Sequence, residues 1–431
     1  MMYKSLLKKI KSKKINICII GLGYVGLPKA LRFIRKGLNI FGIDEDFNKI
    51  NSLKNSISYI SGIKNKDLRY FKKFKNNLST SYSLIRNVDI IIICLPTPLR
   101  KNKTPDMKYV FNCAKKIKKN LNKNTLLVLE STVYPGATEE FLGKIFSDFE
   151  LIGKDFFVSY SPERENPGDK NFNYKKTPKI VGGFTEKCKK LSMELYSHIV
   201  KKVIPVSSIK VAELTKLHEN IYRAINIGLV NEMKIISNKL GINIYEVIDA
   251  AGTKNFGFQK FYPGPGLGGH CIPIDPFYLS WLSKKNGYEP RLIKTAGEIN
   301  TKITNQIIKK IIKNLEKKNS KVLIIGVAYK KNTNDDRESP SLKIINELKK
   351  NKIKVSYHDP YIDKINKGRN FRHSIKSINL NKNNIIKSDL VVVVTDHDNV
   401  NYNLIKNFSK KIIDCRGVFK NDYYSDKIIL A

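Results

Sequence analysis

The stretch INICIIGLGYVGLP, residues 15–28, decides the fold of this chain of 431 residues. It is a short apolar run that ends in a turn with glycine at positions 21, 23 and 26. The spacing of the apolar side chains over residues 27–34 predicts a helix directly after the turn. A second apolar run, residues 38–43, follows and leads into Asp44. Strand, glycine-rich turn, helix and strand together make up a βαβ unit.

The glycine-rich turn has the pattern of a dinucleotide site, with Tyr24 and Val25 inside it. Gly21 permits the tight turn, Gly23 lets a pyrophosphate approach the backbone, and Gly26 lets helix and strand pack closely. Asp44 can accept hydrogen bonds from both hydroxyls of a ribose, and its charge would repel a 2′-phosphate. The pattern therefore predicts NAD rather than NADP, with a purely structural glycine turn as the alternative.

Outward from this unit, apolar runs and helical periods alternate over the first half of the chain. We expect strands at Val88–Leu95, Thr125–Leu129, Phe156–Ser159 and Lys202–Val206, with helical segments between them. This alternation is typical of an open, mostly parallel sheet.

The apolar period changes to three or four residues at about Ser208 and predicts a long helix that reaches towards Leu240. Helical patterning continues to about Ile312. Strand and helix patterns then return, at Lys321–Val327, Ser341–Lys350, Val355–His358, Leu390–Thr395 and Ile412–Asp414. The expected fold class is α/β, with two Rossmann-like doubly wound domains joined by a central helical domain, at residues 1–207, 208–317 and 318–431.

Composition excludes several classes of protein. No apolar run approaches the roughly 20 residues of a membrane helix, and the basic start lacks the apolar core of a secretory signal, so we expect a cytoplasmic protein with no membrane partner. The six cysteines are far apart and form no zinc pattern. The formal charge of +41 comes from lysines spread along the whole chain, which indicates a compositional bias rather than specific nucleic-acid binding.

The loop FYPGPGLGGHCIPID, residues 261–275, carries the most chemical information. Its many glycines and prolines exclude a regular element and leave backbone amides free to bind a ligand. A loop cysteine, Cys271, in a nicotinamide enzyme suits thiol addition to an aldehyde. The alternative is a buried loop cysteine, with Asp275 capping a helix that begins near Phe277.

Several motifs in a fixed order resemble one family from about Ile15 to Gly417. They are GLGYVGLP at 21–28, STV at 131–133, SPER at 161–164, AELTKLHEN at 212–220, the GGHC loop and YKKNTNDDRESP at 329–340. The chain resembles the UDP-glucose/GDP-mannose dehydrogenases, and within them the UDP-N-acetylglucosamine 6-dehydrogenases. The resemblance implies an NAD domain, a central dimerisation domain and a C-terminal UDP-sugar domain. It also implies a homo-oligomer that is at least a dimer.

The resemblance also implies roles for single residues. Cys271 matches the nucleophile that forms a thioester, Lys216 and Asn220 the helix pair that faces the reacting carbon, and Glu163 a carboxylate for proton transfer and hydrolysis. Asp275 and Thr132 match residues that orient the water. Expected cofactor contacts are Lys49, Thr97, Thr132 and Arg337, and expected substrate contacts are Arg164, Tyr262, Gly264, Gly266, Gly268, Lys330 and Arg416, besides Glu163, Lys216 and Asn220.

The chain departs from the UDP-glucose enzymes at several positions. Ile274 stands where they often have lysine, Pro167 where they have a second glutamate, and an interface arginine is replaced near Asn255. These changes favour a UDP-N-acetylhexosamine, best UDP-N-acetylglucosamine, over UDP-glucose. UDP-N-acetylgalactosamine and UDP-N-acetylmannosamine stay open. A two-electron β-hydroxyacid dehydrogenase and a noncatalytic basic binding protein are the rival functions.

Overall fold

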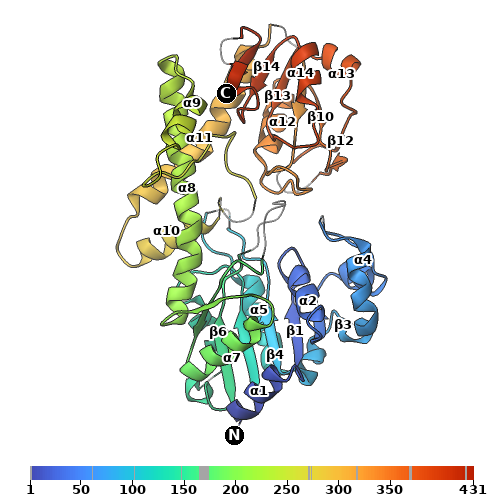
Figure 1. The fold of residues 1–431 in the computed structure, drawn as a ribbon, viewed down its shortest axis with the longest axis vertical. Helices are drawn as coiled ribbons and strands as arrows, with labels where there is room; N and C mark the ends of the chain where they lie inside the picture. The colour runs from blue at the N-terminus through green and yellow to red at the C-terminus, as the bar shows by residue number, and fades with distance from the viewer. Residues whose placement is uncertain are drawn as a thin grey trace. The chain divides into compact units, whose positions relative to one another are not determined.

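The computed structural model describes residues 2–60, 62–100, 102–146, 148–164, 174–269, 272, 274–316, 319–367, 371–422 and 425–431. The chain divides into two compact units. The first is Met1–Glu219 with Phe277–Leu282, and the second is Asn220–Pro276 with Ser283–Ala431. Figure 1 shows the elements of each unit, coloured along the chain. Each unit is described by itself.

The first unit is built on a sheet of eight strands in the order β3-β2-β1-β4-β5-β6-β7-β8. The strands are β1 (Asn16–Ile20), β2 (Asn39–Ile43), β3 (Leu78–Ser79), β4 (Ile90–Ile93), β5 (Thr125–Leu129), β6 (Phe156–Tyr160), β7 (Lys179–Gly183) and β8 (Val203–Pro205). Only the pair of β6 and β7 is antiparallel among these strands. All four isoleucines of β4 are buried, as expected for a central strand that is covered on both faces. The predicted mostly parallel sheet is confirmed.

Helices accompany this sheet at the positions that a βαβ fold requires. They are α2 (Gly26–Ile34), α3 (Phe47–Lys54), α4 (Asn65–Leu68), α5 (Lys108–Lys118), α6 (Ala137–Gly143) and α7 (Glu186–Ser197). The basic N-terminal segment, for which the sequence analysis predicted no element, forms helix α1 (Met2–Lys11) and packs on α7. It does so because Leu6 and Ile10 share one face and are fully buried.

The second unit has a sheet of five strands in the order β10-β9-β13-β14-β15, all parallel. The strands are β9 (Lys321–Ile325), β10 (Lys354–His358), β13 (Leu390–Val393), β14 (Ile412–Asp414) and β15 (Ile428–Leu430), with a separate pair β11 (Lys364–Ile365) and β12 (Ile375–Lys376). The helices are α9 (Ile244–Ala251), α11 (Arg291–Lys313), α12 (Pro340–Lys350), α13 (Lys382–Ile386) and α14 (Tyr402–Phe408), together with parts of α8 (Ile209–Lys239) and α10 (Asp275–Lys285).

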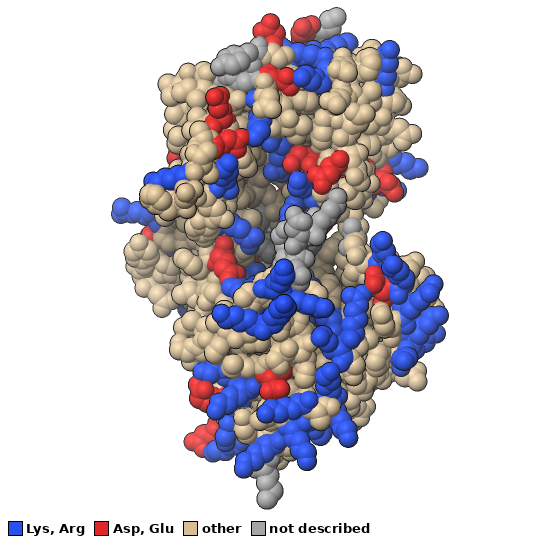
Figure 2. Space-filling model, viewed as in Figure 1, with Lys and Arg blue, Asp and Glu red and all other residues tan. Residues whose placement is uncertain are grey.

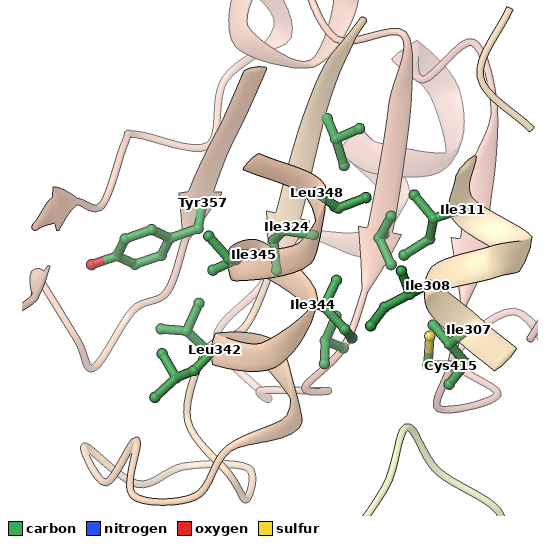
Figure 3. Close-up of a cluster of buried hydrophobic side chains, with 14 of the residues drawn as sticks. Ile307, Ile308, Ile311, Ile324, Leu342, Ile344, Ile345, Leu348, Tyr357 and Cys415 are labelled. Carbon is green, nitrogen blue, oxygen red and sulfur yellow. The ribbon is translucent and has the colours of Figure 1, made fainter. Parts of the chain in front are cut away.

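Alternate residues of this second sheet enter two different cores. Val322 and Ile324 of β9 pack with α11 and α12, whereas Leu323 and Ile325 pack with α8 and α9. Figure 3 shows the first core, where isoleucines of α11 meet the apolar face of α12 and Ile324. Because side chains alternate across a strand, both faces of the sheet are apolar and must be covered. Replacing Ile324 by alanine would cost roughly 2–5 kcal/mol of stability.

Helix α8 is the predicted long helix, and its 31 residues span about 46 Å at 1.5 Å per residue. In the second unit it approaches α11 closely. A Cβ on Gly228 would lie only 3.2 Å from the Cα and Cβ of Ala296. The small residues let the two backbones come near enough for polar side chains to bridge them. In the described part of the chain, no helix combines the length and the apolar character needed to cross a membrane.

Candidate active site

The glycine-rich turn between β1 and α2 has the shape of a phosphate-binding turn. Gly21 has φ +90°, and a Cβ there would lie 2.5 Å from the carbonyl oxygen of Cys94. A Cβ on Gly26 would lie 1.9 Å from the carbonyl oxygen of Gly21, so only glycine fits. A Cβ on Gly23 would meet nothing within 4 Å, which leaves open space beside its backbone. The turn therefore fits a dinucleotide whose pyrophosphate lies against Gly23 and the start of α2, next to Tyr24 and Val25.

Asp44 lies directly after β2 and is 9% exposed. Its Oδ2 accepts the N–H of Leu22 at 2.8 Å, and its Oδ1 accepts the N–H of Asp46 at 3.0 Å. The Nζ of Lys49 lies 3.4 Å from each carboxylate oxygen. The turn and the carboxylate are thus joined directly.

Thr97 and Thr132 lie in the loops that follow β4 and β5. The Oγ1 of Thr97 donates to the carbonyl of Thr132 at 2.7 Å, and the N–H of Leu95 donates to the Oγ of Ser131 at 3.0 Å. The hydroxyl of Tyr278 donates to the carbonyl of Thr97 at 2.7 Å. Two predicted cofactor contacts therefore lie together at the carboxyl ends of parallel strands, where dinucleotides bind in such sheets.

In the first unit, Glu163 and Lys216 are held together by the backbone. The Nζ of Lys216, a 7% exposed residue of α8, donates to the carbonyl oxygen of Glu163 at 2.7 Å. The carboxylate Oε1 of Glu163 accepts the N–H of Arg164 at 2.7 Å. The guanidinium of Arg164 is bound to the carboxylate of Glu219 and to the carbonyl of Pro178, so it is a neighbour of this pair.

The sequence analysis missed a buried group of charged side chains around the carboxylate of Glu163. Lys29 of α2 contacts the carboxylates of Glu130 and Glu163, and Lys179 of β7 donates to Glu130 at 2.9 Å. The hydroxyl of Tyr196 also donates to Glu130. The available signal was Lys29 itself, since it lies between Gly26 and Phe33 on the buried face of a helix.

In the second unit, Asn220 and Asp275 are hydrogen-bonded to each other. The Nδ2 of Asn220 donates to the carboxylate of Asp275, and the Oδ1 of Asn220 accepts from the guanidinium of Arg223. Asn220 and Asp275 are 0% and 3% exposed, and Asp275 is the first residue of α10. Cys271, four residues earlier, lies outside the described residues.

Polar side chains of α8 and α11 hold the glycine-rich loop through hydrogen bonds to its backbone. The N–H of Gly264 donates to the Oδ1 of Asn231 at 3.0 Å, and the Nδ2 of Asn231 donates to the Oδ1 of Asn300 at 2.9 Å. The Oγ1 of Thr304 donates to the carbonyl of Pro265 at 2.7 Å. Gly266 has φ +131°, and a Cβ there would lie 2.4 Å from that Oγ1. Asn231, Asn300 and Thr304, called the loop clamp below, were not found from the sequence.

The other predicted substrate residues lie at both ends of this loop. Tyr262 stacks on Tyr245 with ring centres 6.2 Å apart and donates to the carboxylate of Asp249, while its side chain stays half exposed. A guanidinium nitrogen of Arg416 lies 2.9 Å from where a Cβ of Gly264 would be. The Nε of Arg416 donates to the carbonyl of Val394 at 2.9 Å.

The loop end packs on the segment after β9. A Cβ on Gly268 would lie 2.7 Å from the Cβ of Tyr329, the residue before Lys330. The N–H of Gly269 donates to the carbonyl of Arg337 at 3.0 Å. The guanidinium of Arg337 is paired with Asp335 at 2.5 Å and is about half exposed. The structure therefore brings the predicted residues Arg337 and Arg416 next to the loop that contains Gly264 and Gly268, and Lys330 directly follows Tyr329, which packs on the loop.

Surface charge follows the compositional bias. On the face shown in Figure 2, lysine and arginine side chains are spread over many elements, with acidic side chains between them. Among the described residues, no group of three His, Cys, Asp or Glu side chains is arranged to hold a metal ion.

Comparison with known proteins gives one consistent picture. The NAD binding domain of the UDP-glucose/GDP-mannose dehydrogenase family matches residues 15–200, its central domain residues 210–302, and its UDP binding domain residues 323–421. Protein CapL of Staphylococcus aureus is 36% identical over 94% of this chain and 95% of its own length. A UDP-N-acetyl-D-glucosamine 6-dehydrogenase of Salmonella typhi is 37% identical over 81% of this chain and 83% of its own length.

Similarity extends to UDP-N-acetylmannosamine enzymes. A UDP-N-acetyl-D-mannosamine dehydrogenase of Methanococcus vannielii is 33% identical over 94% of this chain and 91% of its own length. Among solved structures, a UDP-D-ManNAc dehydrogenase from Pyrococcus horikoshii superimposes with a TM-score of 0.82 at 29% identity, over 93% of this chain and 95% of the other.

Proposed function

Because this chain belongs to the UDP-glucose/GDP-mannose dehydrogenase family, we propose that it oxidises C6 of a UDP-N-acetylhexosamine, with UDP-N-acetylglucosamine as the best candidate, to the uronic acid. Family membership makes it an NAD-dependent UDP-sugar dehydrogenase, which is an oxidoreductase. The proposed oxidation removes four electrons, consumes two NAD and one water, and provides an acidic sugar for a surface polysaccharide. The noncatalytic alternative is thereby set aside.

The hydrogen bond between Asn220 and Asp275 is the observation that best supports this reaction. It joins side chains that lie 55 positions apart in the sequence, one on α8 and one at the end of the glycine-rich loop. Both residues are buried, so the bond is shielded from water. Cys271, the proposed nucleophile, precedes Asp275 by four residues in the sequence.

The proposed steps use the side chains of the chain as follows. The hydroxyl of C6 loses a proton, and a hydride leaves to NAD, which supplies the hydride acceptor. The thiolate of Cys271 then adds to the aldehyde, a second hydride passes to the second NAD, and a thioester remains. Lys216, fixed to the carbonyl of Glu163, provides a positive charge for the developing oxyanions, and the amide of Asn220 provides a second polar contact. Glu163, Asp275 and Thr132 take part in the attack of water that releases the acid and restores the thiol.

Binding of the UDP-sugar is assigned to the loop that the clamp holds. The N–H groups of Gly266 and Gly268 are offered as donors to a diphosphate, and Arg416, whose guanidinium lies close to Gly264, together with Lys330 would provide positive charge. The three expected domains, at 1–207, 208–317 and 318–431, remain our proposal for how NAD binding, dimerisation and UDP-sugar binding are divided.

The N-acetyl group is supported by the relatives and by the loop. The similar proteins include enzymes named for UDP-N-acetyl-D-glucosamine and others named for UDP-N-acetyl-D-mannosamine, which differ in configuration at C2. Ile274, where UDP-glucose enzymes often have lysine, is 9% exposed. A pocket that hydrogen-bonds the acetamido group would leave polar groups unpaired with UDP-glucose, which costs more than the roughly 1–3 kcal/mol of a missing methylene. UDP-N-acetyl-D-mannosamine is the second candidate substrate because enzymes named for it match 94% and 95% of this chain at 33% identity.

The test is NADH formation with UDP-N-acetylglucosamine, UDP-N-acetylmannosamine, UDP-N-acetylgalactosamine and UDP-glucose at equal concentration. We expect two NADH per sugar, and kcat/KM for the preferred UDP-N-acetylhexosamine about a hundredfold above that for UDP-glucose. A ratio of one NADH with free aldehyde accumulating would contradict the four-electron reaction. Preference for UDP-glucose would contradict the substrate assignment only.

We also propose that two copies of the chain associate through α8. Tyr222, Leu229, Met233, Ile236 and Leu240 follow one another at spacings of seven, four, three and four, and each is 38% or more exposed. This spacing places the first four on one face of α8, and Leu240 directly follows the last residue of the helix. Together they form an apolar stripe that water would contact in a monomer. Light scattering should give the mass of at least two chains, and Leu229→Glu with Ile236→Glu should lower it to one.

A further inference from the structure

Lys29 is a lysine in an unusual place. It belongs to α2, the helix that follows the glycine-rich turn, and it is on the buried face of that helix with 2% of its surface exposed. Removing an ammonium group from water costs several kcal/mol unless opposite charges surround it. The dinucleotide turn does not account for a lysine side chain here, because the Nζ of Lys29 contacts the carboxylates of Glu130 and Glu163 instead.

The contacts of Lys29 are two carboxylates from different strand ends. Its Nζ contacts Glu130, which follows β5, and lies 2.5 Å from the Oε2 of Glu163, which follows β6. Lys179 balances the group, at 2.9 Å from Glu130 and 3.9 Å from Glu163. Two ammonium groups therefore face two carboxylates inside the first unit, and the charges cancel.

Three separate contacts fix Glu163 in this arrangement. Its Oε2 faces Lys29, its Oε1 accepts the N–H of Arg164, and its backbone carbonyl accepts from Lys216. Burial alone would raise the pKa of Glu163, but Lys29 and then Lys179 outweigh burial and hold it well below its ordinary value. Other described groups near this carboxylate are the carboxylate of Glu130, the thiol of Cys94 and the hydroxyl of Tyr196, and Arg32 and Tyr174 line the same cavity as Glu163.

We propose that Lys29 is a positioning residue that keeps Glu163 ionised and fixed beside Lys216 for the reaction. The inference rests on the proposed function, in which Glu163 assists hydrolysis of the thioester. A carboxylate held in this way is a weak proton acceptor, but it retains lone pairs that can orient a water molecule. In this role the carboxylate of Glu163 acts through its negative charge and its fixed position, and the contact with Lys29 maintains both.

The first test compares the pH dependence of kcat in Lys29→Met, Lys29→Arg and wild type. In Lys29→Met, Lys179 is, among the described residues, the one ammonium group left between the carboxylates of Glu163 and Glu130. Glu163 should therefore become protonated at a higher pH than in wild type. In Lys29→Met we expect the fall of kcat on the acidic side of the profile to occur at least about one pH unit higher than in wild type. At a fixed pH on that side, this shift is about a tenfold loss of kcat. The KM for NAD should be unchanged. Lys29→Arg should restore the wild-type profile. Lys36→Met, which removes an exposed lysine just beyond the same helix, should match wild type.

The second test does not depend on turnover. A double-mutant cycle with Lys29→Met and Glu163→Gln, followed by chemical unfolding, measures the coupling of the two side chains directly. We expect the double variant to lose less stability than the two single variants lose together. Additive losses, or an acidic limb that stays in place in Lys29→Met, would overturn the proposal. If wild type oxidises no UDP-sugar while the cycle shows coupling, the proposed function fails and the pairing of Lys29 with Glu163 stands.

Discussion

The loop clamp gives the sharpest prediction about substrate binding, through the single substitution Asn231→Leu. The leucine side chain has the same branched skeleton of four heavy atoms but can neither accept from the N–H of Gly264 nor donate to the Oδ1 of Asn300. Both groups lie in buried residues, where each unsatisfied partner costs about 1–3 kcal/mol, so the expected loss of stability is roughly 2–6 kcal/mol.

The same substitution should weaken substrate binding more than cofactor binding. Without Asn231 the backbone of the loop at Gly264 loses its support on α8, whereas the glycine turn and Asp44 lie in the first unit. We expect KM for the UDP-sugar to rise at least about tenfold while the Kd of NAD stays the same, since tenfold corresponds to about 1.4 kcal/mol of lost binding.

Denaturant unfolding, steady-state kinetics and NAD titration measure these quantities, with Asn238→Leu as the control. Asn238 is an exposed asparagine of the same helix, so its replacement should leave all three measurements at wild-type values. If Asn231→Leu unfolds at the wild-type denaturant concentration and keeps the wild-type KM, the clamp has no role in holding the loop.

Three other substitutions separate cysteine chemistry from cofactor binding. Cys271→Ala should abolish formation of the acid, and wild-type acid production by this variant would remove the thiol from the mechanism. Asp44→Ala should weaken NAD binding and relax discrimination against NADP, because the hydroxyl acceptor and the repulsive charge both disappear; an unchanged Kd would show that the ribose is held elsewhere. Gly26→Ala should prevent NAD binding or folding, since its Cβ would lie 1.9 Å from the carbonyl oxygen of Gly21, and a stable variant with normal affinity would refute this geometry.

Local patterns in the sequence were sufficient for the fold class and for the dinucleotide turn. The apolar runs at β1, β5 and β14 and the three-to-four-residue period of α8 depend on neighbours close in the chain, so they can be read directly. The order of the motifs was likewise sufficient for the family, which the matching domains confirm. The roles of Cys271, Glu163 and Asp275 remain predictions.

Tertiary structure alone decided which polar side chains support the site. Lys29 contacts Glu130, which lies 101 positions away in the sequence, and Asn231 contacts Asn300, which lies 69 positions away. No local spacing of residues predicts either contact. In a chain with 79 lysines and arginines, a lysine by itself carries little information. Lys29 became informative only because folding buried it, and a buried charge must find a partner. Periodicity tells which face of a helix is buried, whereas the three-dimensional packing of distant strand ends decides what that face contacts.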